Sequence, residues 1–180
     1  MEKASCFLTF GMENKFQYMK HTILLLGTNM GDRDSNLALA QRYLSENSVE
    51  ILSSSSIYES EAWGKQDQQS FLNQALIVKS KLAPKELLHT LLAIEKKIGR
   101  VRKEKWGERI IDIDILFIED QVINESELVV PHPYIQERRF TLLPLVELAS
   151  NELHPVDKKS MDSLLDACED ELAVKKLNHL

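Results

Sequence analysis

The stretch that decides the fold reads Ile110-Ile-Asp-Ile-Asp-Ile-Leu-Phe117. Successive side chains of a β-strand point to opposite faces, so Asp112 and Asp114 share one face and the isoleucines between them share the other. Such alternation is typical of an antiparallel sheet with one face on the core and the other face polar. The pattern therefore predicts a strand over residues 109–118 that presents two carboxylates on one side.

Two βα units are predicted before this strand, and a less regular region follows it. Apolar periodicity and turn residues indicate strands over 22–27, 49–58 and 71–80 and helices over 35–46 and 84–98. Later we expect a hairpin return at 121–123, a partly helical stretch at 137–149 that Pro144 breaks or opens, and one amphipathic segment in 161–180. The order favours an α+β, ferredoxin-like sandwich: a mainly antiparallel sheet with helices packed on one face and loops covering the other, which is left for a site.

Length and composition exclude several classes of protein. The chain has 180 residues, 43% of them hydrophobic, which is enough for one domain with a substantial core. Its formal net charge of −6 disfavours a general nucleic-acid binder, and its apolar runs are far shorter than the roughly 20 residues of a membrane span. Cys6 and Cys168 match no metal spacing and favour free thiols. We expect a cytoplasmic monomer with neither nucleic-acid nor membrane partners.

The carboxylate pair is the sharpest chemical feature. Cα atoms two residues apart on a strand are separated by about 6.6–7 Å, so Asp112 and Asp114 can both reach one cation. Carboxylates suit Mg²⁺, which usually takes one or two of them together with substrate phosphates. The alternative is an ordinary edge strand whose polar face lies in water.

Basic residues surround the pair in the sequence. They are Arg100, Arg102, Lys103, Lys105 and Arg109 upstream and His132, Arg138 and Arg139 downstream. Metal carboxylates set among phosphate-binding arginines suit phosphoryl transfer, in which catalysis is mainly positioning and neutralisation of charge. The sequence has neither a Walker A loop nor the protein-kinase signatures. A solvated connection is the alternative for the basic loop at 99–107.

A second group of residues suits a flat ligand. Phe71 and Asn73 share a face of the strand predicted over 71–80, and Trp63 lies in the irregular loop at 59–69 before it. An aromatic ring next to an amide offers stacking and hydrogen bonds to a planar heterocycle. The alternative is that Phe71 is an ordinary core residue.

Taken in order, these stretches resemble the 6-hydroxymethyl-7,8-dihydropterin pyrophosphokinase family of folate biosynthesis. The resemblance runs from about residue 21 to about residue 155 and rests on the ordered series, since Asp-x-Asp alone is common. Its marks are Leu26-Gly-Thr-Asn-Met-Gly-Asp32, Ser56-Ile-Tyr-Glu-Ser60, Gly64-Lys-Gln-Asp-Gln68, Phe71-Leu-Asn73, Glu95, Gly99-Arg-Val-Arg102, Trp106-Gly-Glu-Arg109, Ile111-Asp-Ile-Asp114, Val130-Pro-His-Pro133 and Glu137-Arg-Arg-Phe140.

The resemblance implies an ATP-dependent diphosphotransferase. Members transfer a diphosphate from ATP to the hydroxymethyl group of the pterin and release AMP, with a pair of Mg²⁺ ions as cofactor. On the matched positions, the implied catalytic residues are Arg100, Arg109, Asp112 and Asp114, and the two aspartates are the implied metal ligands. The implied ATP contacts are Glu95, Arg102, Trp106, His132, Arg138 and the backbone of Ile115, and the implied pterin contacts are Ser60, Trp63, Phe71, Asn73 and Phe140.

The chain departs from the family at a few positions. Phe71 stands where members have Tyr or Phe, and Glu127 and Val129 stand where some have Arg and Thr, so no nucleotide contact is carried over to those two side chains. The loop between Arg102 and Trp106 is shorter than in some relatives. We expect residues 1–20 to be a peripheral N-terminal extension and residues 21–180 to be a single catalytic domain.

Two other functions compete with this interpretation. One is a different Mg²⁺-dependent enzyme, a phosphohydrolase or nucleotidyl transferase, that uses the same Asp-x-Asp pair. The other is an RNA-binding module on a similar α+β sandwich, which the acidic net charge and the lack of ribonucleoprotein aromatic motifs disfavour. Analysis of the nucleotide product separates the first from the expected enzyme.

Overall fold

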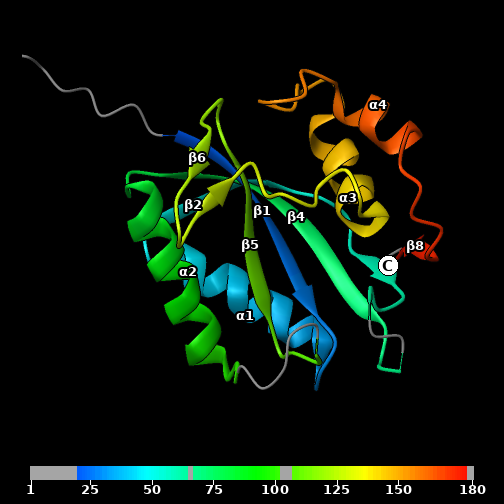
Figure 1. The fold of residues 1–180 in the computed structure, drawn as a ribbon. Coiled ribbons are helices and arrows are strands. Elements are labelled where there is room, and N and C mark those ends of the chain that lie inside the picture. The colour runs from blue at the N-terminus through cyan, green and yellow to red at the C-terminus, as the bar shows by residue number, and fades with distance from the viewer. Residues whose placement is uncertain (1–19, 65–66, 102–106, 178–180) are drawn as a thin grey trace, which may run out of the picture.

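An antiparallel sheet forms the centre of the protein (Figure 1). The computed structural model describes residues 20–64, 67–101 and 107–177. Its elements in chain order are β1 (Lys20–Thr28), α1 (Arg33–Glu46), β2 (Val49–Ser54), β3 (Tyr58–Ser60), β4 (Phe71–Ser80), α2 (Pro84–Ile98), β5 (Asp112–Ile118), β6 (Ile123–Asn124), β7 (Val129–Val130), α3 (Arg139–Ala149), α4 (Met161–Asp166) and β8 (Val174–Lys176).

The strand order places β1 and β4 in the interior of the sheet and β5 at an edge. The main sheet runs β5-β1-β4-β3-β8, β2 also pairs with β4, and every pairing in it is antiparallel. In β1–α1–β2 and in β4–α2–β5, the two strands of each unit are parallel and a third strand lies between them. The two predicted βα units are therefore present, and they interleave in one sheet.

Helices cover both faces of this sheet, which corrects the expectation that they pack on one face only. Leu24 and Leu26 of β1 belong to a core shared with α1 and α2, whereas Leu25 belongs to a second core with α3 and α4. Figure 1 shows the two helix pairs on opposite sides of the strands. Apolar residues at successive positions indicate a strand that is buried on both faces, and the three leucines at 24–26 of β1 are such a run. The second face carries a pocket beside the start of α3.

Local residues explain where the helices on the first face begin and end. Asp32 caps α1, because its carboxylate accepts the backbone N–H of Ser35 at 3.1 Å. Helix α2 opens with Pro84, whose fixed φ suits the first turn. It ends at Gly99, which has a φ of 118° that side chains disfavour.

Several predicted elements differ from the structure. The strand expected over 49–58 is two strands, β2 and β3, because its serines interrupt the ladder on β4. The segment at 121–123 does not return on β5; β6 pairs with β7 instead. Helix α3 runs through Pro144, which neither breaks nor opens it. The C-terminal segment holds α4 as expected and also β8, a short strand with no strong sequence signal.

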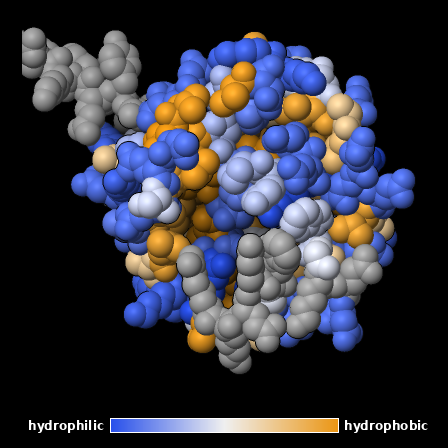
Figure 2. Space-filling view, viewed as in Figure 1, coloured by the Kyte–Doolittle hydropathy of each residue, from blue (hydrophilic) through white to orange (hydrophobic). Residues whose placement is uncertain are grey.

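The surface carries no large apolar region on the face drawn in Figure 2, where hydrophobic side chains form separate groups among hydrophilic ones. Large hydrophobic residues with more than half of their surface exposed are scattered along the described chain: Val101, Val122, Leu153 and Val156. Among the described residues, no helix combines the length and the apolar character needed to cross a membrane. Cys168 is a free, half-buried thiol, and Cys6 lies outside the described residues.

Candidate active site

A pocket lies on the second face of the sheet, beside the start of α3. Its walls combine the two aspartates with the residues predicted to hold a flat ligand. The lining residues are Leu25, Gly27, Ser60, Glu61, Trp63, Phe71, Asn73, Arg109, Asp112, Asp114, Arg138 and Phe140. Segments that are far apart in the sequence therefore meet in one cavity.

Strand register explains why these side chains share one face. Gly27 of β1 pairs with Asp112 on β5 and with Asn73 on β4, so the three residues form a row across the sheet. Leu25 pairs in the same way with Asp114 and Ala75, and Phe71 pairs with Ser60 on β3. The middle position of the first row has no side chain, which leaves open space between the carboxylate and the amide. A Cβ added there would lie 3.6 Å from Asn73 Oδ1.

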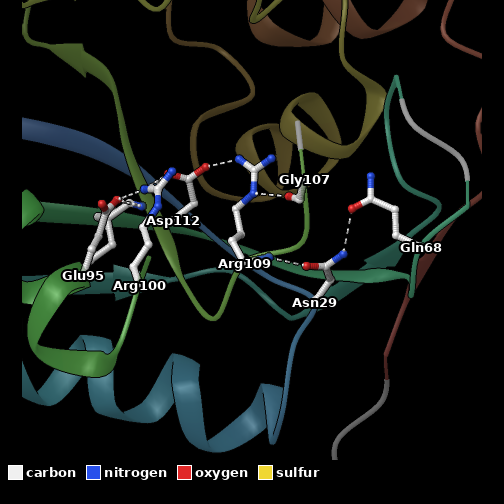
Figure 3. Close-up of polar contacts among 8 residues, drawn as sticks. Asn29, Gln68, Glu95, Arg100, Gly107, Arg109 and Asp112 are labelled. Atoms are coloured by element: carbon white, nitrogen blue, oxygen red, sulfur yellow. Dashed lines mark hydrogen bonds and ion pairs between the residues drawn. The ribbon is translucent and has the colours of Figure 1, made fainter. Parts of the chain in front are cut away.

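Asp112 is held by two arginines, as Figure 3 shows. One carboxylate oxygen pairs with Arg100 and the other with Arg109. Arg100 also lies 2.6 Å from the carboxylate of Glu95, which in turn accepts the backbone N–H of Ile113 at 2.8 Å. Arg100 thus reaches from the end of α2 around the edge strand to the pocket face.

The two aspartates differ in their electrostatic surroundings. Burial would raise the pKa of Asp112, but Arg100 and Arg109 outweigh it and hold that pKa below its usual range. Burial and the charge of Asp112 raise the pKa of Asp114 to about 7. Burial and the same charge also raise the pKa of Glu95. Burial is thus the main reason that a negative charge on Asp114 is disfavoured, and the charge of Asp112 adds to it.

The pterin-type residues predicted from the sequence are brought together. Asn73 is buried and donates from Nδ2 to Ser60 Oγ at 2.9 Å. The guanidinium of Arg109 lies 5.5 Å from the ring centre of Phe71. Phe140 lines the same pocket at the start of α3.

Arg138 lies among aromatic rings, directly before the first residue of α3. Its guanidinium carbon lies 4.7 Å from the ring centre of Trp63, 5.0 Å from that of Tyr134 and 5.8 Å from that of Phe140. Its buried Nε makes no hydrogen bond within the described chain. These contacts hold the Arg138 cation in the pocket that Asp114 also lines, and Asp114 is the charge that favours this cation most.

His132 lies at the edge of β5 that faces away from β1. Its backbone N–H donates to Leu116 O at 3.0 Å, and its Nδ1 accepts the backbone N–H of Tyr134 at 3.3 Å. Burial, together with the charge of Arg138, lowers the pKa of His132 to about 4. The imidazole is therefore neutral near pH 7, and its proton lies on Nε2, which can donate to an anion.

Some predicted residues fall outside the pocket lining. The side chain of Ile115 is buried in the first core. Its backbone groups nevertheless point away from β1, because the backbone N–H of Ile113 does so and residues two apart on a strand point the same way. Both contacts of the Glu95 carboxylate are within the chain. Arg102 and Trp106 lie outside the described residues.

Gly27 and Asn29 belong to the site, although the sequence assigned them no role beyond their part in the resemblance. Gly27 forms the floor of the pocket, and Asn29 bonds to residues on two sides of it. The signal was the Gly27-Thr-Asn-Met-Gly31 stretch directly after a strand, which indicates a turn but not its neighbours.

Comparisons with known proteins point to one family. Residues 23–150 match the family described as 7,8-dihydro-6-hydroxymethylpterin-pyrophosphokinase. Proteins named 2-amino-4-hydroxy-6-hydroxymethyldihydropteridine pyrophosphokinase are similar: that of Aquifex aeolicus is 44% identical over 79% of this chain and 89% of its own length. That of Methylorubrum extorquens is 40% identical over 73% and 84%, and that of Bacillus subtilis is 42% identical over 69% and 75%.

Solved structures with the same fold are also similar. The wild-type HPPK-DHPS of Plasmodium falciparum matches with a TM-score of 0.64 and 18% identity, over 83% of this chain. The chain spans 44% of that protein's length, and the likeness concerns the fold alone. With the family match and the identities to the pyrophosphokinases, the chain belongs to the 7,8-dihydro-6-hydroxymethylpterin-pyrophosphokinase family.

Proposed function

We propose that this protein transfers a diphosphate from ATP to the hydroxymethyl group of 6-hydroxymethyl-7,8-dihydropterin and releases AMP. The observation that carries the proposal is the single pocket that joins the ring-binding residues Phe71, Asn73 and Phe140 to the carboxylates Asp112 and Asp114. Family membership supports the same reaction, because the similar proteins are named for it.

The pterin is proposed to lie over Gly27. Phe71 and Phe140 line the pocket and would stack on the two faces of the ring. Because Asn73 Nδ2 is used by Ser60, its Oδ1 is the group that would accept hydrogen bonds from the pterin. Ser60 and Trp63 would meet the edge of the ring through their backbones.

The residues present fit a Mg²⁺ site. Asp114 projects into the pocket, and the raised pKa of its carboxylate marks a place where a cation is favourable. In the described chain, no group of three or more His, Cys, Asp or Glu side chains could hold a metal ion, so further ligands would be phosphate oxygens and water. When bound, Mg²⁺ supplies neutralisation of the triphosphate charge, and the proposal retains the two ions implied by the resemblance.

Arginines are proposed to stabilise the transferring group. The pterin hydroxyl oxygen forms a bond to the β-phosphorus, the bond from that phosphorus to the oxygen shared with the α-phosphate breaks, and AMP leaves with that oxygen. Arg100 and Arg109 already converge at Asp112, one edge of the pocket, where they can neutralise charge during the transfer. The hydroxyl proton passes to solvent or phosphate, because the carboxylates beside Gly27, Asp112 and Asp114, are assigned to the metal in this proposal.

The remaining ATP contacts are proposed around β5. The outward backbone of Ile115 suits the edge of an adenine, His132 can donate from Nε2 to a phosphate, and Arg138 supplies a positive charge. Glu95 is proposed to act on the nucleotide side through Arg100, its partner at 2.6 Å. Arg102 and Trp106 keep their proposed roles as contacts of the loop that precedes Arg109.

Other expectations continue as proposals. The strand order β5-β1-β4-β2 with two interleaved βαβ units supports a ferredoxin-like core. We also propose that residues 21–180 are one catalytic domain, that residues 1–20 are peripheral, and that the protein is a cytoplasmic monomer acting where ATP is available.

Product analysis tests the proposed function. Purified protein is incubated with ATP and Mg²⁺, with and without the reduced pterin alcohol, and the nucleotides are separated. The expected result is AMP in an amount equal to pterin diphosphate, and only when the pterin is present. ADP as the product, or AMP released without the pterin, would instead support a phosphohydrolase or nucleotidyl transferase.

A further inference from the structure

Asn29, directly after β1, holds the backbone that leads into the nucleotide side of the pocket. Its side chain and backbone are buried, with 1% of the residue exposed. The backbone N–H of Asn29 donates to Arg109 O at 3.1 Å, and Asn29 Oδ1 accepts the backbone N–H of Arg109 at 2.8 Å. One residue therefore fixes both polar backbone groups of Arg109.

The Nδ2 group of the same amide holds the segment on the pterin side of the pocket. Asn29 Nδ2 donates to Gln69 O at 3.1 Å and lies 3.4 Å from Gln68 Oε1 (Figure 3). Residues 68–69 lead directly into Ser70 and Phe71, and Phe71 lines the pocket. A single buried side chain thus joins the two segments that flank the site.

Each joined segment is tied to a group that would touch a substrate. Arg109 pairs with Asp112 and lies over the ring of Phe71, as described above. On the pterin side, Arg33 donates to Ser70 O at 2.9 Å and pairs with Glu59 at 2.9 Å, which clamps the two ends of the loop. Displacement of either segment would therefore change the bonds of Asn29, and through them the other segment.

We propose that Asn29 is a positioning residue that couples the pterin half of the site to the nucleotide half. This inference rests on the proposed function and assigns that reaction a residue that touches neither substrate. The amide of Asn29 offers an acceptor to Arg109 and a donor to Gln69 from one short planar group. Filling one half holds its segment in place, which prepares the other half for its ligand.

The test is a binding measurement on Asn29→Asp, a substitution that keeps the shape and the acceptor but removes the donors. The probes are 6-hydroxymethylpterin and α,β-methylene-ATP with Mg²⁺, each titrated by calorimetry alone and with the other at saturation. The wild type is expected to bind the pterin at least about fivefold tighter with the nucleotide present. Asn29→Asp is expected to reduce that factor to about twofold or less, with the nucleotide-only Kd nearly unchanged.

Asn36→Asp is the matched control. Asn36 is another buried amide, in α1, and its Nδ2 donates to Met30 O at 2.8 Å and to Thr28 Oγ1 at 3.2 Å, neither of which belongs to the two segments that Asn29 joins. It should retain the coupling factor even if it melts at a lower temperature. Asn29→Ser, whose short hydroxyl cannot reach both loops, is measured alongside, so that a misfolded Asn29→Asp still leaves a result.

The proposal is overturned if the Asn29 variants couple the ligands as the wild type does, if the wild type shows no coupling, or if Asn36→Asp loses it equally. The proposed function fails separately, when wild-type protein makes no pterin-dependent AMP. A wild type that makes AMP while the Asn29 variants retain full coupling would remove only the role of Asn29.

Discussion

Replacing Gly27 with alanine should separate ligand binding from stability. The methyl group would enter the floor of the pocket between Asp112 and Asn73, 3.6 Å from Asn73 Oδ1, which is an ordinary van der Waals contact. Gly27 is not among the positive-φ glycines, so alanine fits its backbone. By limiting the unfolded chain, such a change typically stabilises a protein by about 0.4–1 kcal/mol.

The same methyl group would occupy space that the flat ligand needs. Forcing an extra carbon into a filled site costs about 1–3 kcal/mol, which corresponds to a Kd raised about 5- to 150-fold. Calorimetric titration with 6-hydroxymethylpterin measures the Kd, and thermal melting measures stability. We expect weaker binding with an equal or higher Tm.

Gly31→Ala is the control for this experiment. Gly31 has a φ of 65°, and a methyl group added to it would meet open space, so alanine there introduces backbone strain of about 1–2 kcal/mol without touching the pocket. It should lower the Tm and leave pterin affinity unchanged. An unchanged pterin Kd in Gly27→Ala would refute the placement of the ring over β1, and a Tm reduced by several degrees would refute the fit of alanine to the backbone there.

Two further predictions concern charge. Asp114→Asn should lower the rate of AMP release at least about 100-fold, because it weakens the metal site. Its Tm should be unchanged or higher, because a buried charge beside Asp112 is removed. Near-normal turnover would exclude the metal assignment. Burial would raise the pKa of Glu147, but hydrogen bonds from Tyr58 and Ser56 outweigh it and lower the pKa from 4.5 to about 2. Its stabilisation is therefore complete above pH 4.5 and is lost as pH falls towards 2. Because 28% of the Glu147 side chain is exposed, we expect Glu147→Gln to lower the free energy of unfolding by about 1–2 kcal/mol at pH 7 and by much less at pH 3. Urea unfolding at the two pH values measures this, and equal losses at both would contradict it.

The faces of single strands could be predicted because alternation is a local property. Asp112 and Asp114 do share a face, and Phe71 and Asn73 share another stretch of the same sheet face. The row that brings the two groups together could not be predicted, since it depends on the register of β5 and β4 on β1. That register is set by residues distant in sequence that pack in the two cores.

The helices of the first face were predictable for similar reasons, and those of the second were predictable only in part. Pro84 and Gly99 mark the ends of α2 in the sequence itself. Pro144, by contrast, suggests a break, but the packing of Leu142 and Leu145 in the second core carries α3 through it. Tertiary packing outweighed the local preference there.

The wrapping of β5 by Glu95 and His132 has a consequence for self-association. A strand at the border of a sheet offers free backbone groups to any other chain, which is a common route to aggregation. Here the Glu95 carboxylate covers the N–H of Ile113, and the backbone of His132 covers the carbonyl of Leu116. At the opposite border, β8 is three residues long and carries exposed Lys175 and Lys176. The contacts that surround the site thus also cover two backbone groups of the β5 border, which hinders strand addition there.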